Sequence, residues 1–167
     1  YNREHEIADC LESLLALNYR PANQEIIVVD DASEDRTVET VREYNEVRLI
    51  IQDQNQGQSA ARNLGVQWAK GEIIAFIDSD CIADPNWLRE LLPWFHDPRN
   101  ALVGGYVDSF YQESWLDRYE AVKSPLNMGE KKLMATGEES VFYVPTCNVL
   151  IRKEAYHHAG GLNEKMR

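Results

Sequence analysis

Two short runs of consecutive apolar residues constrain the fold of this chain more than any other feature. They cover residues 26–29 and 73–77, and neither shows the strict alternation of a strand with one wet face. Runs of this kind are typical of strands buried on both faces of a parallel sheet. Segments with helical spacing lie before, between and after them. The sequence therefore predicts an α/β fold, a Rossmann-like, mostly parallel sheet with helices on both faces.

Further helices and strands are predicted from the same periodicities and from turn residues. Asp84-Pro85 is a strong helix start, because Asp is a good N-cap and Pro suits the first helical position. Ser59 is expected to cap another helix, which Lys70-Gly71 ends. Residues 109–143 are aromatic and charged, with weak periodicity, and no element is predicted there. Helices are expected near residues 7–15, 38–41, 59–69, 85–92 and 153–159, and further strands near residues 47–51, 103–107 and 149–151.

The bulk composition narrows the class of protein. The chain has 167 residues, of which 44% are hydrophobic, and this suits one domain with a substantial core. Its formal net charge of −11 repels nucleic-acid phosphates, so DNA and RNA are not expected as partners. Cys10, Cys81 and Cys147 are too few and too scattered for a disulfide framework. Reduced thiols and a cytoplasmic location are therefore expected.

Neither a membrane span nor a secretory signal is expected in this stretch. No apolar run approaches the roughly 20 residues that are needed to cross a bilayer. The polar opening Tyr1-Asn2-Arg3 is unlike the start of a signal peptide. Membrane association through segments outside this stretch stays open, and it would place the protein at the cytoplasmic face.

Acidic residues follow two of the predicted strands. The first strand runs into Asp30-Asp31, and the strand at residues 73–77 runs into Asp78-Ser79-Asp80. In open α/β sheets, ligands bind in the crevice beyond the carboxyl ends of the strands, so both clusters are expected to face one crevice. Carboxylates alone repel phosphate, but Mg²⁺ or Mn²⁺ bound to them attracts it. An Asp-x-Asp at a strand end is therefore a chemically sensible clamp for a diphosphate.

A second segment of the chain could bind phosphate at the start of a helix. This segment and the acidic segments each also have a purely structural interpretation. Residues 56–63 form a glycine turn that feeds a helix N-terminus, where free N–H groups favour anions. Arg62 could lie beside phosphate or could pair with an acid for structural reasons. Asp31 could bind a ligand or could accept turn N–H groups, and Asp78-Ser79-Asp80 is also a common polar turn.

Taken together, these segments resemble the family 2 glycosyltransferases, which have the GT-A fold. Residues 162–163 are Leu-Asn in place of the family's Phe-Asp, which is a departure from the pattern. The matching segments are residues 1–4, similar to the end of a Pro-Thr-Tyr-Asn opening; residues 26–37, similar to Val-Asp-Asp-Gly-Ser-x-Asp-x-Thr; residues 55–63, similar to Asn-x-Gly with Ala-Arg-Asn; residues 76–80, similar to the metal-binding Asp-x-Asp segment; and residues 147–148 and 160–164, similar to a small-residue-Asn pair and Gly-Gly-Phe-Asp-Glu.

The resemblance implies a donor nucleotide site. Tyr1 would lie against the base, and Asp31 would hydrogen-bond it. Arg62 would support the base or phosphate end of the pocket. The family's usual donors are uridine diphosphate sugars, although other bases occur.

The resemblance also implies a metal site and a reaction. Asp80 would be the direct ligand of a divalent Mg²⁺ or Mn²⁺ on the diphosphate, and Asp78 would contact the ribose or the metal. Cys147 and Asn148 would lie near the donor sugar or the acceptor. Family members are typically inverting enzymes, in which a general base helps an acceptor hydroxyl to attack the anomeric carbon. A glycan, a lipid-linked glycan or a protein would serve as acceptor.

The domain organisation that follows is one incomplete glycosyltransferase domain over residues 1–167. Residues 1–105 are expected to form the nucleotide-binding half, and residues 106–167 the start of the acceptor-binding half. The family's first strand is expected before Tyr1 and its general base beyond Arg167, so no catalytic base is assigned within the chain.

Two alternatives remain at this point. The chain could be a catalytically silent transferase-like module that only binds. It could also be a phospho-acceptor receiver domain, since Asp30-Asp31, Asp78 and Lys131 follow a similar order. A whole helix precedes the acidic pair, however, and the glycine turn at residues 56–57 would be unexplained in a receiver.

Overall fold

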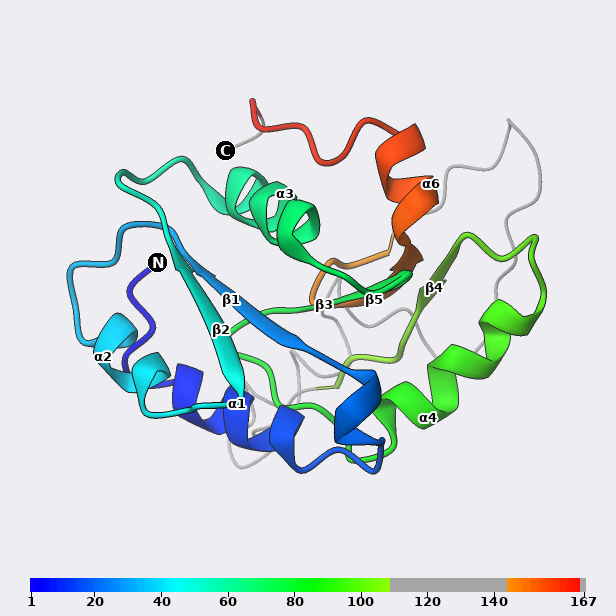
Figure 1. The fold of residues 1–167 in the computed structure, drawn as a ribbon, viewed down its shortest axis with the longest axis horizontal. Helices are drawn as coiled ribbons and strands as arrows, with labels where there is room; N and C mark the ends of the chain where they lie inside the picture. The colour runs from blue at the N-terminus through cyan, green and yellow to red at the C-terminus, as the bar shows by residue number, and fades with distance from the viewer. Residues whose placement is uncertain (109–143, 166–167) are drawn as a thin grey trace, which may run out of the picture.

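The computed structural model describes residues 1–108 and 144–165, which form layers of helices around two small sheets (Figure 1). The α/β fold class predicted from the sequence is confirmed. The elements in chain order are α1 (Ile7–Leu15), η1 (Pro21–Asn23), β1 (Ile26–Asp30), α2 (Thr37–Arg42), β2 (Val47–Ile51), α3 (Gln58–Trp68), β3 (Ile73–Ile77), α4 (Trp87–Leu91), η2 (Leu92–His96), β4 (Leu102–Gly104), β5 (Asn148–Arg152) and α6 (Lys153–His158).

The predicted elements are present, and the differences lie at their ends. Helix α3 begins at Gln58 after Gly57, whose φ of 93° marks the turn, so Ser59 lies inside the helix instead of capping it. Helix α4 begins at Trp87, because Asp84 forms a separate turn in which its carboxylate accepts the N–H of Asn86 at 2.7 Å. The strand expected at residues 103–107 is β4, which ends at Gly104. Residues 109–143 lie outside the described part of the chain.

The strand directions correct the prediction of a mostly parallel sheet. Strands β1 and β2 pair in parallel, from Ile26 with Val47 to Asp30 with Ile51. Strand β5, however, lies antiparallel to both β3 and β4, in the order β3-β5-β4. The sequence could not show this, because an apolar strand such as β5 is buried equally well in either direction. The pairing of β5 with β3 also joins residues on both sides of the expected boundary at residue 105.

A large cavity separates the two sheets. Its volume is about 1070 Å³, and it is lined by residues 26–29 of β1 and by the whole of β3, with α1 and α3 beside them. Within the described residues, β1 pairs only with β2 and β3 only with β5, so their facing edges are unpaired. This explains why residues 26–29 are half-buried instead of fully buried.

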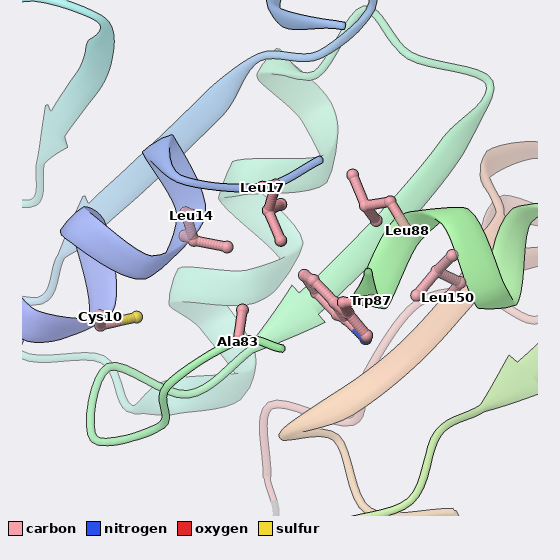
Figure 2. Close-up of a cluster of buried hydrophobic side chains, with 7 residues drawn as sticks. All are labelled: Cys10, Leu14, Leu17, Ala83, Trp87, Leu88 and Leu150. Atoms are coloured by element: carbon pink, nitrogen blue, oxygen red, sulfur yellow. The ribbon is translucent and has the colours of Figure 1, made fainter. Parts of the chain in front are cut away.

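The largest cluster of buried side chains in the described residues joins α1, α4 and β5. Helix α1, the loop before α4, α4 itself and β5 all contribute to it (Figure 2). Leu150 of β5, which belongs to this cluster, is fully buried. Since apolar area removed from water is the main stabilising term, these contacts hold α1 and α4 against the sheet. The members are Cys10, Leu14, Leu17, Ala83, Trp87, Leu88 and Leu150.

Truncation of the fully buried Leu150 side chain should lower the stability of the fold. We expect Leu150→Ala to lower the free energy of unfolding by about 2–5 kcal/mol, because it leaves a cavity that the neighbours fill only partly. Leu102→Ala on the neighbouring β4 is the matched control. Leu102 is 42% exposed, and we expect less than about 1 kcal/mol there. Chemical denaturation measures both, and equal losses would contradict this view of the core.

Candidate functional site

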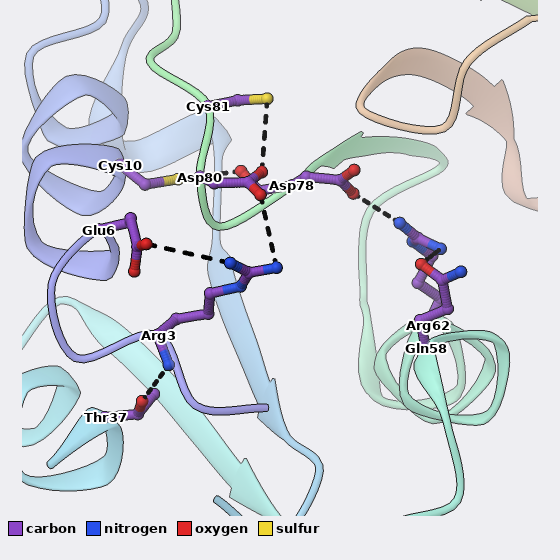
Figure 3. Close-up of polar contacts among 9 residues, drawn as sticks. All are labelled: Arg3, Glu6, Cys10, Thr37, Gln58, Arg62, Asp78, Asp80 and Cys81. Atoms are coloured by element: carbon purple, nitrogen blue, oxygen red, sulfur yellow. Dashed lines mark hydrogen bonds and ion pairs between the residues drawn. The ribbon is translucent and has the colours of Figure 1, made fainter. Parts of the chain in front are cut away.

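The Asp-x-Asp segment lies at the carboxyl end of β3, and its first acid is held by helix α3. Asp78 Oδ1 lies 2.5 Å from Arg62 Nη2 (Figure 3). The Arg62 side chain is only 16% exposed, and its other Nη donates to Gln58 Oε1 at 3.1 Å. A buried guanidinium on a helix gives the Asp78 carboxylate a fixed orientation. The pairing of Arg62 with an acid, considered above as the structural alternative, is thus the arrangement that the structure has.

The second acid, Asp80, faces the N-terminal segment. Arg3 Nη2 lies 3.5 Å from Asp80 Oδ2, and Arg3 Nη1 lies 3.9 Å from Glu6 Oε1. The side chains of Arg3 and Asp80 are 42% and 46% exposed. At these distances and exposures the ion pair is weak and exchanges readily with solvent or a ligand. Asp80 therefore presents an accessible carboxylate with a cation beside it.

Arg3 reaches this place because the loop after β1 binds the N-terminal backbone. Three side chains, spaced two residues apart along that loop, each accept one backbone N–H from residues 2–4. No local pattern in the sequence signals this contact or the place of Arg3, because the donors and acceptors lie 31 to 34 residues apart. The bonds are Asn2 N to Ser33 Oγ at 2.9 Å, Arg3 N to Thr37 Oγ1 at 2.7 Å and Glu4 N to Asp35 Oδ2 at 3.1 Å.

Asp30, the last residue of β1, and Asp31 accept hydrogen bonds from backbone N–H groups. Asp31 is buried, and its two oxygens accept the N–H groups of Gln56 and Gly57 at 2.7 and 2.8 Å. Asp30 Oδ2 accepts the N–H of Ser33 at 2.9 Å, and its Oδ1 has no partner among the described residues. Asp31 therefore fixes the turn that starts α3. Its expected hydrogen bond to a base would have to use the remaining lone pairs.

Replacement of Asp31 by Asn tests this clamp. An Asn oxygen can accept only one of the two N–H groups, and its NH₂ would face the other. We expect Asp31→Asn to lower the free energy of unfolding by about 1–3 kcal/mol. Asp53→Asn, the same change at an exposed position, should stay within about 0.5 kcal/mol. Denaturation of both variants decides the matter, and an unchanged Asp31→Asn protein would refute the clamp.

Cys147 directly precedes β5 and Asn148 is its first residue, and the two side chains have different roles. Cys147 is buried, and burial followed by the charge of Asp78 raises the pKa of its thiol. Asn148 Oδ1 accepts Trp87 Nε1–H at 2.7 Å, while its Nδ2 donates to Tyr106 O at 2.7 Å. Both ends of the Asn148 amide thus bind protein. Cys147 lies beside the acidic segment, whereas Asn148 holds the start of β5 against α4.

All three thiols of the chain are free and lie near the acidic segment. Burial, followed by the charges of Asp80 and Asp78, raises the pKa of Cys10 to about 11. Burial, followed by Cys147 and Asp80, raises the pKa of Cys81 to about 12. These groups are protonated at neutral pH, so they add no negative charge beside the two aspartates.

The raised thiol pKa values predict a loss of stability in alkali. The folded state keeps these protons where the unfolded chain, with an ordinary value near 9.0, releases them. Stability is therefore complete below about pH 9 and falls as pH rises toward 11. We expect Cys10→Ser to lessen the slope of unfolding free energy against pH by up to about 1.4 kcal/mol per unit. Denaturation from pH 8 to pH 10.5 measures it, and an identical slope would contradict the assignment.

One cavity brings most of the predicted site residues together. It is the cavity between the sheets, whose lining includes Tyr1, Asp31, Arg62, Asp78 and Asp80. Tyr1 is 50% exposed, so its ring is available to a ligand. Cys147 and Asn148 do not line this cavity.

The carboxylates of Asp78 and Asp80 suit a divalent cation such as Mg²⁺. No group of three or more His, Cys, Asp or Glu side chains gathers for a metal within residues 1–108 and 144–165. A fully protein-held cage is therefore absent there. Mg²⁺ and Mn²⁺ instead take one or two carboxylates and complete their shell with water and phosphate oxygens. Asp78 and Asp80, at 37% and 46% side-chain exposure, supply such a pair.

Solved structures define the class of fold. The chain superposes on S. aureus TarS 1–349 in complex with UDP with a TM-score of 0.77 and 20% identity, covering 99% of this chain and 48% of that one. It superposes on the mannosyltransferase PcManGT from Pyrobaculum calidifontis, in complex with GDP-Man and Mn²⁺, with a TM-score of 0.73 and 21% identity, covering 98% and 45%. The fold is thus the GT-A fold of nucleotide-sugar transferases.

The sequence comparison then gives the family. Residues 1–160 match the family described as glycosyl transferase family 2, and the chain belongs to this family. It is 30% identical over 166 residues to glycosyltransferase AglE of Haloferax volcanii, with 96% of this chain and 52% of AglE covered. The chain thus spans about half the length of that curated relative. Family membership overturns the receiver alternative, whose Lys131 lies outside the described residues.

Within the described part of the chain, no helix is long and apolar enough to cross a bilayer.

Proposed function

We propose that this chain forms the donor site of an inverting, metal-dependent glycosyltransferase that moves a sugar from a uridine diphosphate donor to an acceptor hydroxyl. The observation that carries the proposal is the pair of accessible carboxylates, Asp78 and Asp80, which line the same cavity as Tyr1 and Asp31. A pair of accessible carboxylates suits a divalent cation that shares its remaining coordination positions with a diphosphate.

A bound Mg²⁺ or Mn²⁺ would neutralise the charge that builds on the departing diphosphate. Asp78 and Asp80 are the residues that would hold it. The PcManGT structure in complex with GDP-Man and Mn²⁺ supports the choice of metal, and the TarS structure in complex with UDP supports the choice of nucleotide. The base is proposed to be uracil, which is the family's usual donor base.

The two arginines have separate tasks in this proposal. Arg62 keeps the Asp78 carboxylate oriented through its bond of 2.5 Å, so that the carboxylate is in place before any ligand arrives. Arg3 is held only by weak pairs with Asp80 and Glu6, and it can turn toward a phosphate oxygen once Asp80 is engaged. Preorganised charge of this kind reduces the reorganisation needed in the transition state.

The acceptor would approach from the β5 side of the crevice. A hydroxyl of a glycan, a lipid-linked glycan or a protein would attack the anomeric carbon in one displacement, with a general base to remove its proton. No residue of the described chain is assigned as that base. The buried Cys147 would form part of the floor on this side, beside Asp78.

Calorimetric titration with UDP tests the proposal. We expect binding that requires Mn²⁺, because the acidic crevice repels a free diphosphate. Asp80→Asn removes one charge from the carboxylate pair, and we expect affinity to fall by about 100-fold, or about 2.8 kcal/mol. Arg62→Met should weaken binding less, since it only frees Asp78.

A matched control is available at the opposite end of the sheet. Glu46→Gln makes the same change of charge just before β2, at an exposed position, and should leave UDP affinity unchanged. The donor-site proposal fails if neither UDP nor GDP binds with Mn²⁺, or if Glu46→Gln and Asp80→Asn weaken binding equally.

A further inference from the structure

Asn63, the residue after Arg62, makes a set of contacts that the proposed donor site does not use. Its Nδ2 donates to Leu162 O at 2.9 Å, and its Oδ1 accepts the N–H of Leu162 at 2.9 Å. The side-chain amide thus pairs with both backbone groups of one residue, as a neighbouring strand would. Nδ2 also donates to Glu164 Oε1 at 2.8 Å, and Tyr156 Oη donates to Asn63 Oδ1.

Only an asparagine satisfies this arrangement. An aspartate offers no donor to Leu162 O, and the longer glutamine would place its amide about 1.5 Å too far out. The partner segment is shaped to receive it, since Gly161 has a φ of 75°. A Cβ on Gly161 would lie 2.8 Å from Asn63 Oδ1, too close for any other residue without a shift.

Two successive residues of α3 therefore serve two parts of the chain that are far apart in sequence. Arg62 contacts Asp78 at the end of β3, and Asn63 contacts the segment of residues 161–164. Successive helical residues point about 100° apart, so a rigid helix fixes the position of one contact relative to the other. Figure 1 shows the segment after α6 running along α3 toward its N-terminal end.

We propose that Asn63 is a positioning residue that fixes residues 161–164, and with them the Glu164 carboxylate, relative to the donor site. This inference rests on the proposed function. The Asn63 side chain makes no hydrogen bond to Asp78 or Asp80, so it acts on turnover through the segment it holds and leaves donor affinity alone. The bond from Asn63 Nδ2 orients the Glu164 carboxylate.

Asn63→Asp is the decisive variant. It keeps the acceptor for Leu162 N–H but loses both Nδ2 donors, and it places a carboxylate against Leu162 O and Glu164. We expect the Leu162 amide to exchange its hydrogen about tenfold faster, because the segment opens more often. In the protein that carries this chain, we expect kcat to fall at least about tenfold, while UDP affinity with Mn²⁺ stays within about twofold.

Two further variants make the test specific. Asn45→Asp makes the same substitution at an exposed position before β2, away from this segment, and should alter neither exchange nor kcat. Tyr156→Phe removes only the hydroxyl that donates to Asn63. It should shift exchange and kcat in the same direction by a smaller factor, and it remains informative if Asn63→Asp does not fold.

The outcomes separate this inference from the proposed function. Unchanged exchange at Leu162, or a loss of UDP affinity as large as the loss of kcat, overturns the positioning role. An equal effect of Asn45→Asp overturns the positioning role as well. Failure of the unaltered chain to bind any nucleotide sinks the donor site, and with it the turnover role of Asn63, while the exchange result still reports whether Asn63 holds the segment.

Discussion

Several carboxylates lie at one end of the two sheets, and their mutual repulsion destabilises this end unless each one binds a positively charged or N–H group. Each is matched by a donor from a different part of the chain: Asp31 by backbone N–H groups of the turn before α3, Asp78 by Arg62 on α3 and Asp80 by Arg3 of the N-terminal segment. The electrostatic need for partners thus ties three remote segments into one site. The three neighbouring thiols stay protonated and add no further charge.

Helix α3 carries most of this organisation. Asp31 fixes the turn at Gly57 from which the helix starts, Arg62 on its next turn orients Asp78, and Asn63 holds Leu162. Because a helix transmits position rigidly over a few residues, a disturbance at its start would reach both contacts. In the described residues, α3 is therefore the element through which the nucleotide side and the later segment of the chain are placed relative to each other.

The sequence allowed the elements and the acids to be predicted, but not how they are satisfied. Apolar runs identified β1 and β3, and their trailing acids identified the crevice, because a strand end and its next residue are neighbours in both sequence and space. Arg3 escaped notice because its position depends on Ser33, Asp35 and Thr37 binding an N-terminal backbone about 30 residues away. The direction of β5 escaped for a similar reason, since burial alone carries no direction.

The sequence by itself determined the α/β class, the order of the elements, the family resemblance and the acids that face the crevice. Each of these depends on periodicity or on motifs that are local in the chain. Only the tertiary structure decided that Arg62 pairs with Asp78, that Asn148 is engaged by Trp87 and Tyr106, and that Asn63 holds Leu162. These contacts join residues 16 to 99 positions apart, and which partner each polar side chain finds depends on which elements pack together.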